Sequence, residues 1–390
     1  MSLLAIACVV GALVAGCGSS SSSSSSGGET SSTAEGSETG SGGEESGGGS
    51  SNALVAEAEK KVEEYSAPVT EWPGPETSKP IVKGKSFVVI PCSMAAEGCA
   101  RQAEGFVEGA KAVGWKTKLI NPEGDINKTN AAIEQAITLG VDGIFLVSVD
   151  PKTVSGTLAE ARKKGIEVID SGAGGPQSKP SPTGLSHEVS LHGPLEGEMI
   201  AWFLIAHSGG KANIALINDS EFATVVERVE ATQQILSKCP ECKISQEIDI
   251  PVTAVGSTLG ARVKSLLQAN PDIEYVWSPY DSATDEIVQS VVEEGKQEQI
   301  GVTGFNGNAQ NLEYIREGQA QIADVGEALN WAGWAGVDDF NRIFHGEEPP
   351  EDDGVPAKLF TESNLPEPGE QFEGEYDYQK KYKELWGVGG

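Results

Sequence analysis

The sequence predicts an α/β protein with two Rossmann-like lobes, each built on a parallel sheet. First, short apolar runs alternate with amphipathic helical patterns from Lys83 onward, which is the rhythm of strand–helix–strand units. Second, this rhythm stops after about residue 170 and starts again near residue 195. Third, the body comprises about 300 residues, which is more than one hydrophobic core normally holds.

The first half of the body is expected to contain four strands. Phe87–Ile90 is a continuous apolar run, typical of a strand that is covered on both faces. The further strands are expected at residues 118–120, 144–147 and 168–169. The helices between them are expected at residues 103–113, at residues 129–139 and in the stretch up to Gly165. A glycine ends each helical pattern, as is common at helix C-termini.

The second half is expected to repeat this arrangement. A helix at residues 195–206 precedes strands at residues 214–217, 244–250, 275–277 and 302–303. Helices are expected between these strands at residues 225–237, at residues 259–269 and in the stretch up to Glu294. Repeated units of this kind favour parallel sheets with right-handed crossovers.

The first 17 residues resemble a bacterial lipoprotein signal peptide. Cys17 follows the run Leu13-Val14-Ala15-Gly16, which looks like a lipobox, and residues 3–16 carry no charge. That length suits a signal sequence and is short for a membrane span. There is no Lys or Arg before Lys60, so the usual positive start is missing. The resemblance implies lipidation of Cys17; an ordinary secretory signal is the alternative.

The composition beyond Cys17 predicts a flexible tether. Residues 18–52 are almost entirely Ser, Gly, Thr and Glu, and residues 53–83 are expected to form a helix and a linker. A Ser/Gly-rich chain cannot bury enough apolar surface to fold. The formal net charge of −30 argues against nucleic acid as a partner, because nucleic acid requires basic patches. No later stretch is long and apolar enough to span a bilayer, so the lipid would be the membrane anchor.

The four cysteines of the body are expected to form two disulfides. Cys92 pairs locally with Cys99, and Cys239 with Cys242, as short-range pairs do outside the cytoplasm. A zinc site made of all four, or a redox role for the second pair, is a less favoured alternative. The four histidines lack metal-ligand spacing, and no metal or cofactor is expected.

Polar residues gather at the expected carboxyl ends of the strands. In α/β sheets, ligands bind at these ends, where the loops meet. The two lobes are therefore expected to face each other across a cleft. The segments concerned are residues 92–93, Ser148, Asp150, residues 170–172, residues 218–219, residues 279–281 and residues 304–307.

Between residues 84 and 362 the chain resembles the periplasmic sugar-binding proteins of the ribose/galactose type, which are type I solute-binding proteins of ABC importers. The resemblance rests on residues 112–115 with 139–144, on Asn270-Pro271-Asp272 before the strand that ends in Trp277, and on residues 302–307.

The resemblance implies two similar lobes joined by a hinge of three chain crossings. These are expected near residues 188–192, 324–328 and 357–361. The first lobe is expected to comprise residues 84–189 plus 304–325, and the second residues 190–303 plus 326–357. Residues 358–390 are then the third crossing and a C-terminal extension.

The resemblance also implies ligand-binding residues in the second lobe. Arg228 occupies the place of a binding arginine, whose planar fork suits adjacent hydroxyls or a carboxylate; a surface ion pair is the alternative. Asn306 stands where relatives often carry Asp, and helix capping is its alternative. Tyr280 and Asp281 follow the strand that ends in Trp277. Asp324 and Glu327 compete for one position at the second crossing.

In the first lobe, further ligand contacts are expected at three strand ends. They are Ser148, Asp170, Ser171, Ser93 and Met94. The aromatic residues that relatives carry in the first loop are missing. Trp331 and Trp334 are interpreted as packing residues, because their spacing places them on one helix face.

Function is therefore expected to be binding and not catalysis. The sequence contains no Gly-x-Ser-x-Gly motif and no Walker-type loop, and carboxylate pairs carry little weight in so acidic a chain. We expect a lipid-anchored monomer, outside the cytoplasm, that delivers a small polar solute to an ABC permease, a monosaccharide or a cyclitol above all. The alternative is a sensory receptor that presents the bound sugar to a membrane kinase or chemoreceptor.

Overall fold

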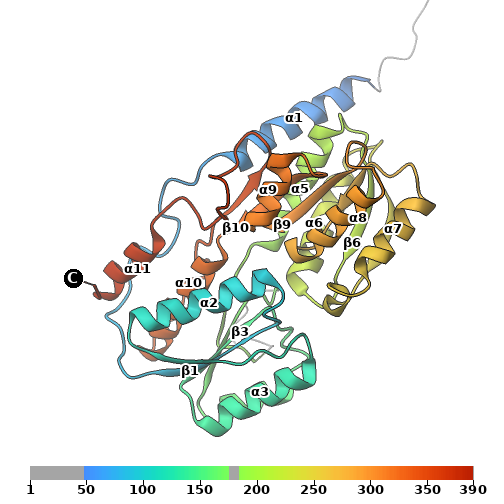
Figure 1. Ribbon diagram of the computed structural model, residues 1–390. Coiled ribbons are helices and arrows are strands. Elements are labelled where there is room, and N and C mark those ends of the chain that lie inside the picture. The colour runs from blue at the N-terminus through green and yellow to red at the C-terminus, as the bar shows by residue number, and fades with distance from the viewer. Residues whose placement is uncertain (1–47, 175–183, 390) are drawn as a thin grey trace, which may run out of the picture. The chain divides into compact units, whose positions relative to one another are not determined.

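The structure is a computed structural model that describes residues 48–174 and 184–389. Cys8, Cys17 and almost all of the expected tether lie outside the described residues. The described chain forms two α/β lobes, each with one sheet (Figure 1). Among its helices, none is long and apolar enough to cross a membrane.

The first lobe contains a five-stranded parallel sheet of order β2-β1-β3-β4-β5. Its strands are β1 (Ser86–Pro91), β2 (Lys116–Leu119), β3 (Gly143–Val147), β4 (Glu167–Ser171) and β5 (His187–Val189). The helices that alternate with them are α2 (Glu97–Ala112), α3 (Ile126–Leu139) and α4 (Ser155–Lys163).

Side chains of β1 point alternately to the two faces of the sheet and pack into two separate hydrophobic clusters. Phe87 and Val89 pack in one hydrophobic cluster with residues of α2, whereas Val88 and Ile90 pack in another with residues of α3 and α4. Successive side chains of a strand point to opposite faces. The continuous apolar run in the sequence thus reflects a strand that is buried on both sides.

The second lobe contains a six-stranded sheet of order β11-β10-β9-β8-β6-β7, in which only β11 is antiparallel to its neighbour. Its strands are β6 (Asn213–Asn218), β7 (Lys243–Asp249), β8 (Tyr275–Trp277), β9 (Gly301–Asn306), β10 (Gln321–Glu327) and β11 (Ala357–Phe360). Its helices are α5 (Gly193–His207), α6 (Ala223–Leu236), the 3-10 turn η1 (Val252–Ala254), α7 (Leu259–Ala269), α8 (Asp281–Glu293) and α9 (Ala309–Glu317).

Two of the expected lobe boundaries are wrong. Residues 304–325 belong to the second lobe, because β9 pairs with β8 and β10 pairs with β9. Residues 326–357 were expected in the second lobe. They contain helix α10 (Leu329–Phe344), which belongs to the first lobe, where it packs against α2. The local pattern identified β9 correctly as a strand, but it carries no information on which sheet a strand joins.

Helices α2 and α10 approach closely because glycines face each other at their contact. A Cβ atom on Gly105 would lie 2.3 Å from the carbonyl oxygen of Asn330, and one on Gly333 would lie 2.2 Å from the backbone nitrogen of Phe106. Real Cβ atoms do not come this near to other atoms. The two glycines therefore fix α10 on the first lobe.

The chain passes between the lobes at residues 190–192, at Ala328 and within residues 345–356. The third passage was expected at residues 357–361, but it lies earlier in the chain. Residues 357–360 already form strand β11 of the second sheet.

Two additional spans lie outside this hinge. Helix α1 (Gly48–Ser66) packs on α5 of the second lobe, and residues 67–85 then lead to β1 of the first lobe (Figure 1). Residues 361–377 lead from β11 back to the first lobe, where α11 (Tyr378–Trp386) contacts α10. The described chain thus connects its lobes five times.

An aromatic cluster fastens both additional spans to the first lobe. The rings of Trp72 and Trp331 stack at 5.0 Å between centroids, and those of Trp334 and Trp386 stack at 5.6 Å. Trp331 and Trp334 are fully buried, which confirms their interpretation as packing residues. The cluster comprises Trp72, Trp331, Trp334, Tyr378, Tyr382 and Trp386.

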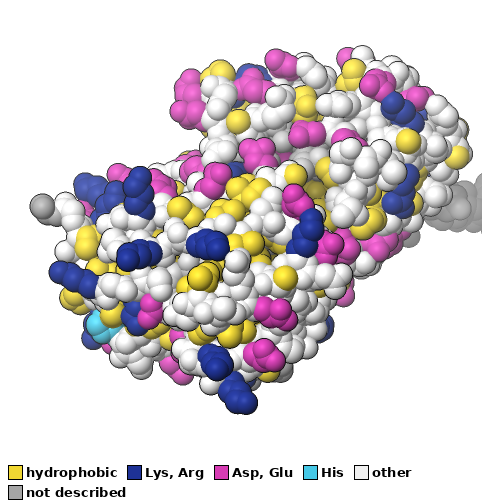
Figure 2. Space-filling view, turned by 60° about the horizontal axis from the view of Figure 1, so that its bottom comes forward, with side chains coloured by type: hydrophobic (Ala, Val, Ile, Leu, Met, Phe, Trp, Pro, Cys, Tyr) yellow, Lys and Arg dark blue, Asp and Glu magenta, His cyan; other side chains and the backbone are white. Residues whose placement is uncertain are grey.

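The structure confirms both expected disulfides, Cys92–Cys99 and Cys239–Cys242. The first lies in the first lobe, between β1 and α2, and the second lies in the second lobe, between α6 and β7. The pairs do not converge on one metal site. On the face shown in Figure 2, acidic and basic side chains lie next to one another.

Candidate ligand-binding site

A cavity lies between the two lobes, at the carboxyl ends of the strands. It contains about 490 Å³ of empty space, including the part that is open to solvent. The first lobe contributes Cys92, Ala96, Gly98, Cys99, Gln102, Ser148 and Gly172, the first crossing contributes Leu191, and the second lobe contributes Phe222, Thr224, Val225, Arg228, Tyr280, Ser282 and Asn306.

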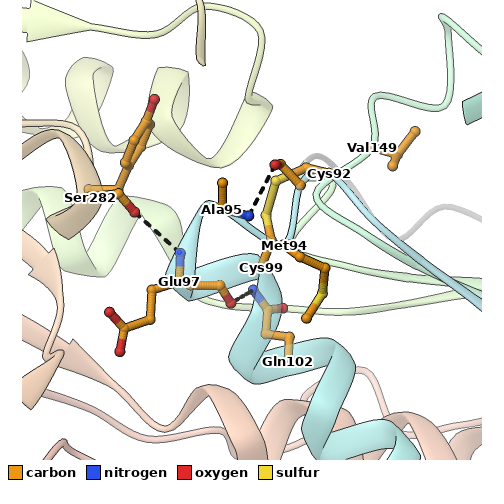
Figure 3. The surroundings of a disulfide bond; sticks show 12 residues. Cys92, Met94, Ala95, Glu97, Cys99, Gln102, Val149 and Ser282 are labelled. Atoms are coloured by element: carbon orange, nitrogen blue, oxygen red, sulfur yellow. Dashed lines mark hydrogen bonds between the residues drawn. A yellow bond between two sulfur atoms is a disulfide. The ribbon is translucent and has the colours of Figure 1, made fainter. Parts of the chain in front are cut away.

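The first-lobe wall is held by the Cys92–Cys99 disulfide, both of whose cysteines line the cavity (Figure 3). The bond joins the end of β1 to the first turn of α2. One turn further along α2, the amide nitrogen of Gln102 donates to the carbonyl oxygen of Gly98 at 3.2 Å, and its amide oxygen accepts from the hydroxyl of Ser171 at 2.6 Å. Gln102 is therefore fixed in one orientation at the cavity.

The second-lobe wall contains a buried ion triad. The Nε atom of Arg228 donates to Glu196 at 2.7 Å, and an Nη atom lies 2.8 Å from a carboxylate oxygen of Glu327. The guanidinium also lies over the ring of Phe305, 4.7 Å from its centroid. All three charged side chains are at most 3 % exposed. The carboxylates therefore neutralise the arginine that lines the cavity.

Burial and electrostatics act in opposite directions within this triad. Burial raises the pKa of Glu196 well above its usual range, although Arg228 opposes the shift. Burial alone lowers the pKa of Arg228, but Glu196 and Glu327 outweigh it, so the net shift is upward. The arginine stays charged, and a neutral ligand suits a cation whose charge is already balanced.

Phe222 and Tyr280 form an aromatic corner of the cavity. Their rings meet edge to face at 5.9 Å between centroids. The hydroxyl of Tyr280 donates to Asp219 at 2.9 Å. Burial raises the pKa of Asp219 to about 7, although the hydrogen bond from Tyr280 opposes the shift.

Two residues of the cavity have unusual backbone conformations. Ser148 has φ of 53° and Asn306 has φ of 118°, values that residues other than glycine rarely adopt. The side chain of Asn306 also donates to Glu327 at 2.8 Å. Such strain persists only where the surroundings impose it, and it concentrates at ligand sites.

The structure brings five of the expected residues together at or behind the cavity. Arg228, Asn306, Tyr280 and Ser148 line it, and Glu327 contacts two of them from behind. Of the two rivals at the second crossing, Glu327 is therefore the one next to the cavity.

The remaining expected residues do not line this cavity. Asp170 accepts a hydrogen bond from the backbone of Val149, and Ser171 holds Gln102. Asp281 and Asp324 accept from the backbone of Asn308 and Gly307, so both bind the loop after β9. Ser93 lines a neighbouring depression, and Met94 packs beside the first-lobe core. Burial and backbone hydrogen bonds direct these carboxylates into the protein.

The lobes also contact each other directly around the cavity. The hydroxyl of Thr224 donates to the carbonyl oxygen of Gly172 at 2.7 Å, and the backbone nitrogen of Glu97 donates to Ser282 at 3.3 Å (Figure 3). Arg101, on α2, donates to the carbonyl oxygen of Asn306 at 2.9 Å. The structure is thus a closed arrangement of the two lobes.

Sequence reasoning missed Gln102, Phe222 and Thr224. Phe222 is the residue before α6, and Gln102 lies within α2. Neither stands at a strand end, where candidates were sought. Phe222 directly precedes the helix that carries Arg228. Its position next to that helix is the one sequence signal that could have identified it.

Residues 87–348 match the family model of the periplasmic binding protein domain, over more than half of the chain. The chain belongs to this family. It is a family of binding proteins, in agreement with the expectation of a receptor and not an enzyme. A curated relative is the ABC transporter periplasmic-binding protein YphF of Escherichia coli (strain K12), which is 26% identical over 233 residues, or 57% of this chain and 69% of that protein.

Solved structures share the fold of this periplasmic binding protein. A 5-methylthioribose transporter solute binding protein from Thermotoga lettingae TMO has a TM-score of 0.68 at 19% identity, over 79% of this chain and 99% of that one. An ABC transporter solute binding protein from Agrobacterium vitis with bound allitol has a TM-score of 0.65 at 19% identity, over 72% and 96% of the two chains.

Proposed function

We propose that the protein is an extracytoplasmic receptor, anchored by a lipid on Cys17, that captures a small neutral polyol or sugar and delivers it to an ABC permease. The observation that carries this proposal is the cavity, which both lobes line with polar groups at their strand ends. The relative YphF is named as an ABC transporter protein. Solved neighbours hold 5-methylthioribose and allitol.

The cavity lining supports a ligand of this chemistry. Ser148, Gln102 and Asn306 offer hydroxyl and amide groups, and Arg228 offers charge-assisted hydrogen bonds that are worth about 1.5–3 kcal/mol each. Phe222 offers an aromatic surface for ring carbons. Because Glu196 and Glu327 balance the charge of Arg228, a neutral ligand fits better than an anion.

Hinge closure would supply the affinity. Polar groups of both lobes can contact one solute only when the lobes meet, and a micromolar dissociation constant corresponds to about −8 kcal/mol. Binding of solute to the closed state alone then stabilises that state. A small number of satisfied hydrogen bonds and one aromatic contact can provide this free energy.

The experiment is a thermal-shift screen of the purified protein against sugars, polyols and cyclitols, followed by calorimetry of each hit. A ligand that binds only the folded state raises the melting temperature. The Phe222→Ala variant should lose the shift, measured against the melting temperature of its own unliganded form. Tyr65→Ala, on α1 and outside the cavity, is the matched control and should keep the shift.

Two results would contradict the proposal. One is a screen in which no neutral polyol raises the melting temperature. The other is equal affinity in the wild type and in the Phe222→Ala variant, which would place the ligand elsewhere. Labelling with radioactive palmitate in a bacterial host, lost in Cys17→Ser, tests the anchor separately.

A further inference from the structure

Three side chains with metal-binding atoms meet beneath the hinge. His187 lies on β5, directly before the first crossing; Asp339 lies on α10, which follows the second crossing; and Asp353 lies in the third crossing. One nitrogen or oxygen atom from each lies within 4.8 Å of the others. Among the described residues, this hinge cluster is the one group of three or more such side chains with that geometry.

The hinge cluster is buried, and its polar atoms lack partners. The side chains of His187, Asp339 and Asp353 are 4 %, 1 % and 3 % exposed. Within the described chain, the Nε2 atom of His187, both carboxylate oxygens of Asp339 and one of Asp353 accept or donate no hydrogen bond. Buried polar atoms in native proteins are almost always satisfied. The unsatisfied atoms of these three side chains therefore indicate a missing partner.

The distances within the cluster leave room for an ion. The Nε2 atom of His187 lies 3.6 Å from an oxygen of Asp339 and 3.6 Å from an oxygen of Asp353, too far for hydrogen bonds. Zinc binds imidazole nitrogen and carboxylate oxygen at about 2.0–2.2 Å in tetrahedral geometry, which places two ligand atoms roughly 3.4 Å apart. The observed separations nearly equal that value.

The charges of the cluster also favour a cation. Arg342, one turn along α10 from Asp338, is bound to that aspartate at 2.7 Å, so it is already paired. Asp339 and Asp353 thus face each other with one imidazole between them. A divalent cation would balance two carboxylates, whereas two buried carboxylates without one repel each other.

We propose that His187, Asp339 and Asp353 form a binding site for a zinc-class divalent cation, which joins the third crossing of the hinge to β5 and α10 of the first lobe. The mixed nitrogen and oxygen donors suit zinc and its transition-metal neighbours. Calcium prefers six to eight oxygens, and magnesium prefers an octahedral shell that is mostly water. Three protein ligands leave the fourth tetrahedral position to a water molecule.

A metal site was not expected from the sequence, and its three ligands indeed come from three separate segments. No two of them share a helix turn, so no ligand spacing can be recognised in the sequence. Only the packing of α10 on the first sheet brings Asp339 to β5. The backbone also fixes Asp353, since a Cβ atom on the next residue, Gly354, would lie 2.2 Å from the carbonyl oxygen of Pro73.

The test uses the full chain, dialysed against a chelator and then titrated with zinc chloride by calorimetry. We expect one equivalent to bind and the melting temperature to rise. Asp353→Asn keeps the size of the side chain but removes the charge, and it should lose at least about tenfold in affinity. The matched control is His192→Gln, which removes a partly exposed histidine beside Asp352 and should bind zinc normally.

A spectrum of the wild type makes the test independent of whether a variant folds. Cobalt(II) in the apo protein should give the intense visible bands of four-coordinate geometry, and zinc should displace it while magnesium should not. The proposal is overturned if the wild type binds no zinc, if the cobalt spectrum is octahedral, or if a folded Asp353→Asn variant binds as the wild type does. If the wild type binds no zinc, the two aspartates share a proton instead.

Discussion

At the residue scale, Arg228 shows how one side chain serves both the cavity and the fold. It lines the cavity, yet it also binds the side chains of two glutamates that are almost completely buried. Removing one partner of a buried ion pair leaves an unpaired charge in a medium that solvates it poorly. Its loss would therefore affect stability before it affects recognition.

We expect Arg228→Ala to lower the free energy of unfolding by about 3–5 kcal/mol, because Glu196 and Glu327 then remain buried without a cation. Urea denaturation of the unliganded protein measures the change. Arg262→Ala is the control: Arg262 is exposed and donates to the carbonyl oxygen of Asp249, so its loss should cost less than about 1 kcal/mol. Equal effects of the two changes would show that the triad does not stabilise the fold.

The titration of Asp219 predicts a dependence of stability on pH. Burial raises its pKa from 3.8 to about 7, so between these values the folded state holds a proton that the unfolded state releases. Stability is therefore complete below about pH 4 and falls as pH rises through this window. We expect the free energy of unfolding to be about 1–3 kcal/mol lower at pH 8 than at pH 5.

The Asp219→Asn variant should flatten this dependence, because the amide does not titrate. Glu188, whose pKa burial raises to about 7, should maintain part of the slope in that variant. Urea titrations of both proteins at several pH values provide the measurement. A slope that is the same with and without Asp219 would exclude its contribution.

At the scale of elements, the two disulfides occupy different environments. Cys92–Cys99 closes the turn between β1 and α2, which forms one wall of the cavity. Cys239–Cys242 closes a turn between α6 and β7 and does not line that cavity. Both bonds close short loops, so each stabilises the fold by a few kcal/mol at most. They should differ in their effect on ligand binding.

We expect the double variant Cys92→Ser, Cys99→Ser to bind its solute about tenfold more weakly, since the free turn must be ordered when the ligand binds. The double variant Cys239→Ser, Cys242→Ser is the matched control and should bind normally. Calorimetry with a solute found in the screen measures both. If the two variants bind equally well, the first disulfide does not order the cavity wall.

How far the sequence predicts this molecule depends on the range of the interactions concerned. Phe87–Ile90 and the other apolar runs correctly indicated strands, because local burial patterns record local structure. The membership of β9 in the second sheet depends on pairing with β8 and β10, and no local pattern records that.

The same distinction applies to the candidate site. Ser148, Tyr280 and Asn306 could be identified because the end of a parallel strand directs its loop toward the ligand edge of a sheet. Gln102 and Phe222 could not, since their places at the cavity depend on how α2 and α6 pack. Asp170 and Asp281 also follow strands, but backbone groups within the protein bind their carboxylates.

At the scale of the whole molecule, the folded unit extends beyond the segment that matches the family. Residues 87–348 exclude β11, α11 and Trp72. Yet β11 completes the second sheet, and the aromatic cluster covers Trp331 and Trp334. The ends of the described chain are therefore part of its core.

Deletion of residues 376–390 should lower the free energy of unfolding by at least about 3 kcal/mol, because it removes the rings of Tyr378, Tyr382 and Trp386 from contact with two buried tryptophans. Urea denaturation followed by tryptophan fluorescence measures the loss. Glu384→Ala, a change at an exposed position of α11, is the control and should have little effect. An unchanged midpoint in the truncated protein would show that α11 only rests on the surface.

The connection between α1 and the aromatic cluster sets a limit on how widely the receptor can open. Helix α1 ends at Ser66 on the second lobe, and Trp72 is stacked in the first lobe, so only residues 67–71 link the two anchor points. The six residue steps from Ser66 to Trp72 reach at most about 22 Å when fully extended. This short connection keeps the two lobes together on the side of the molecule where residues 67–71 lie. We therefore expect the lobes to open by rotation about this connection, so that the gap for solute entry is widest on the side away from residues 67–71.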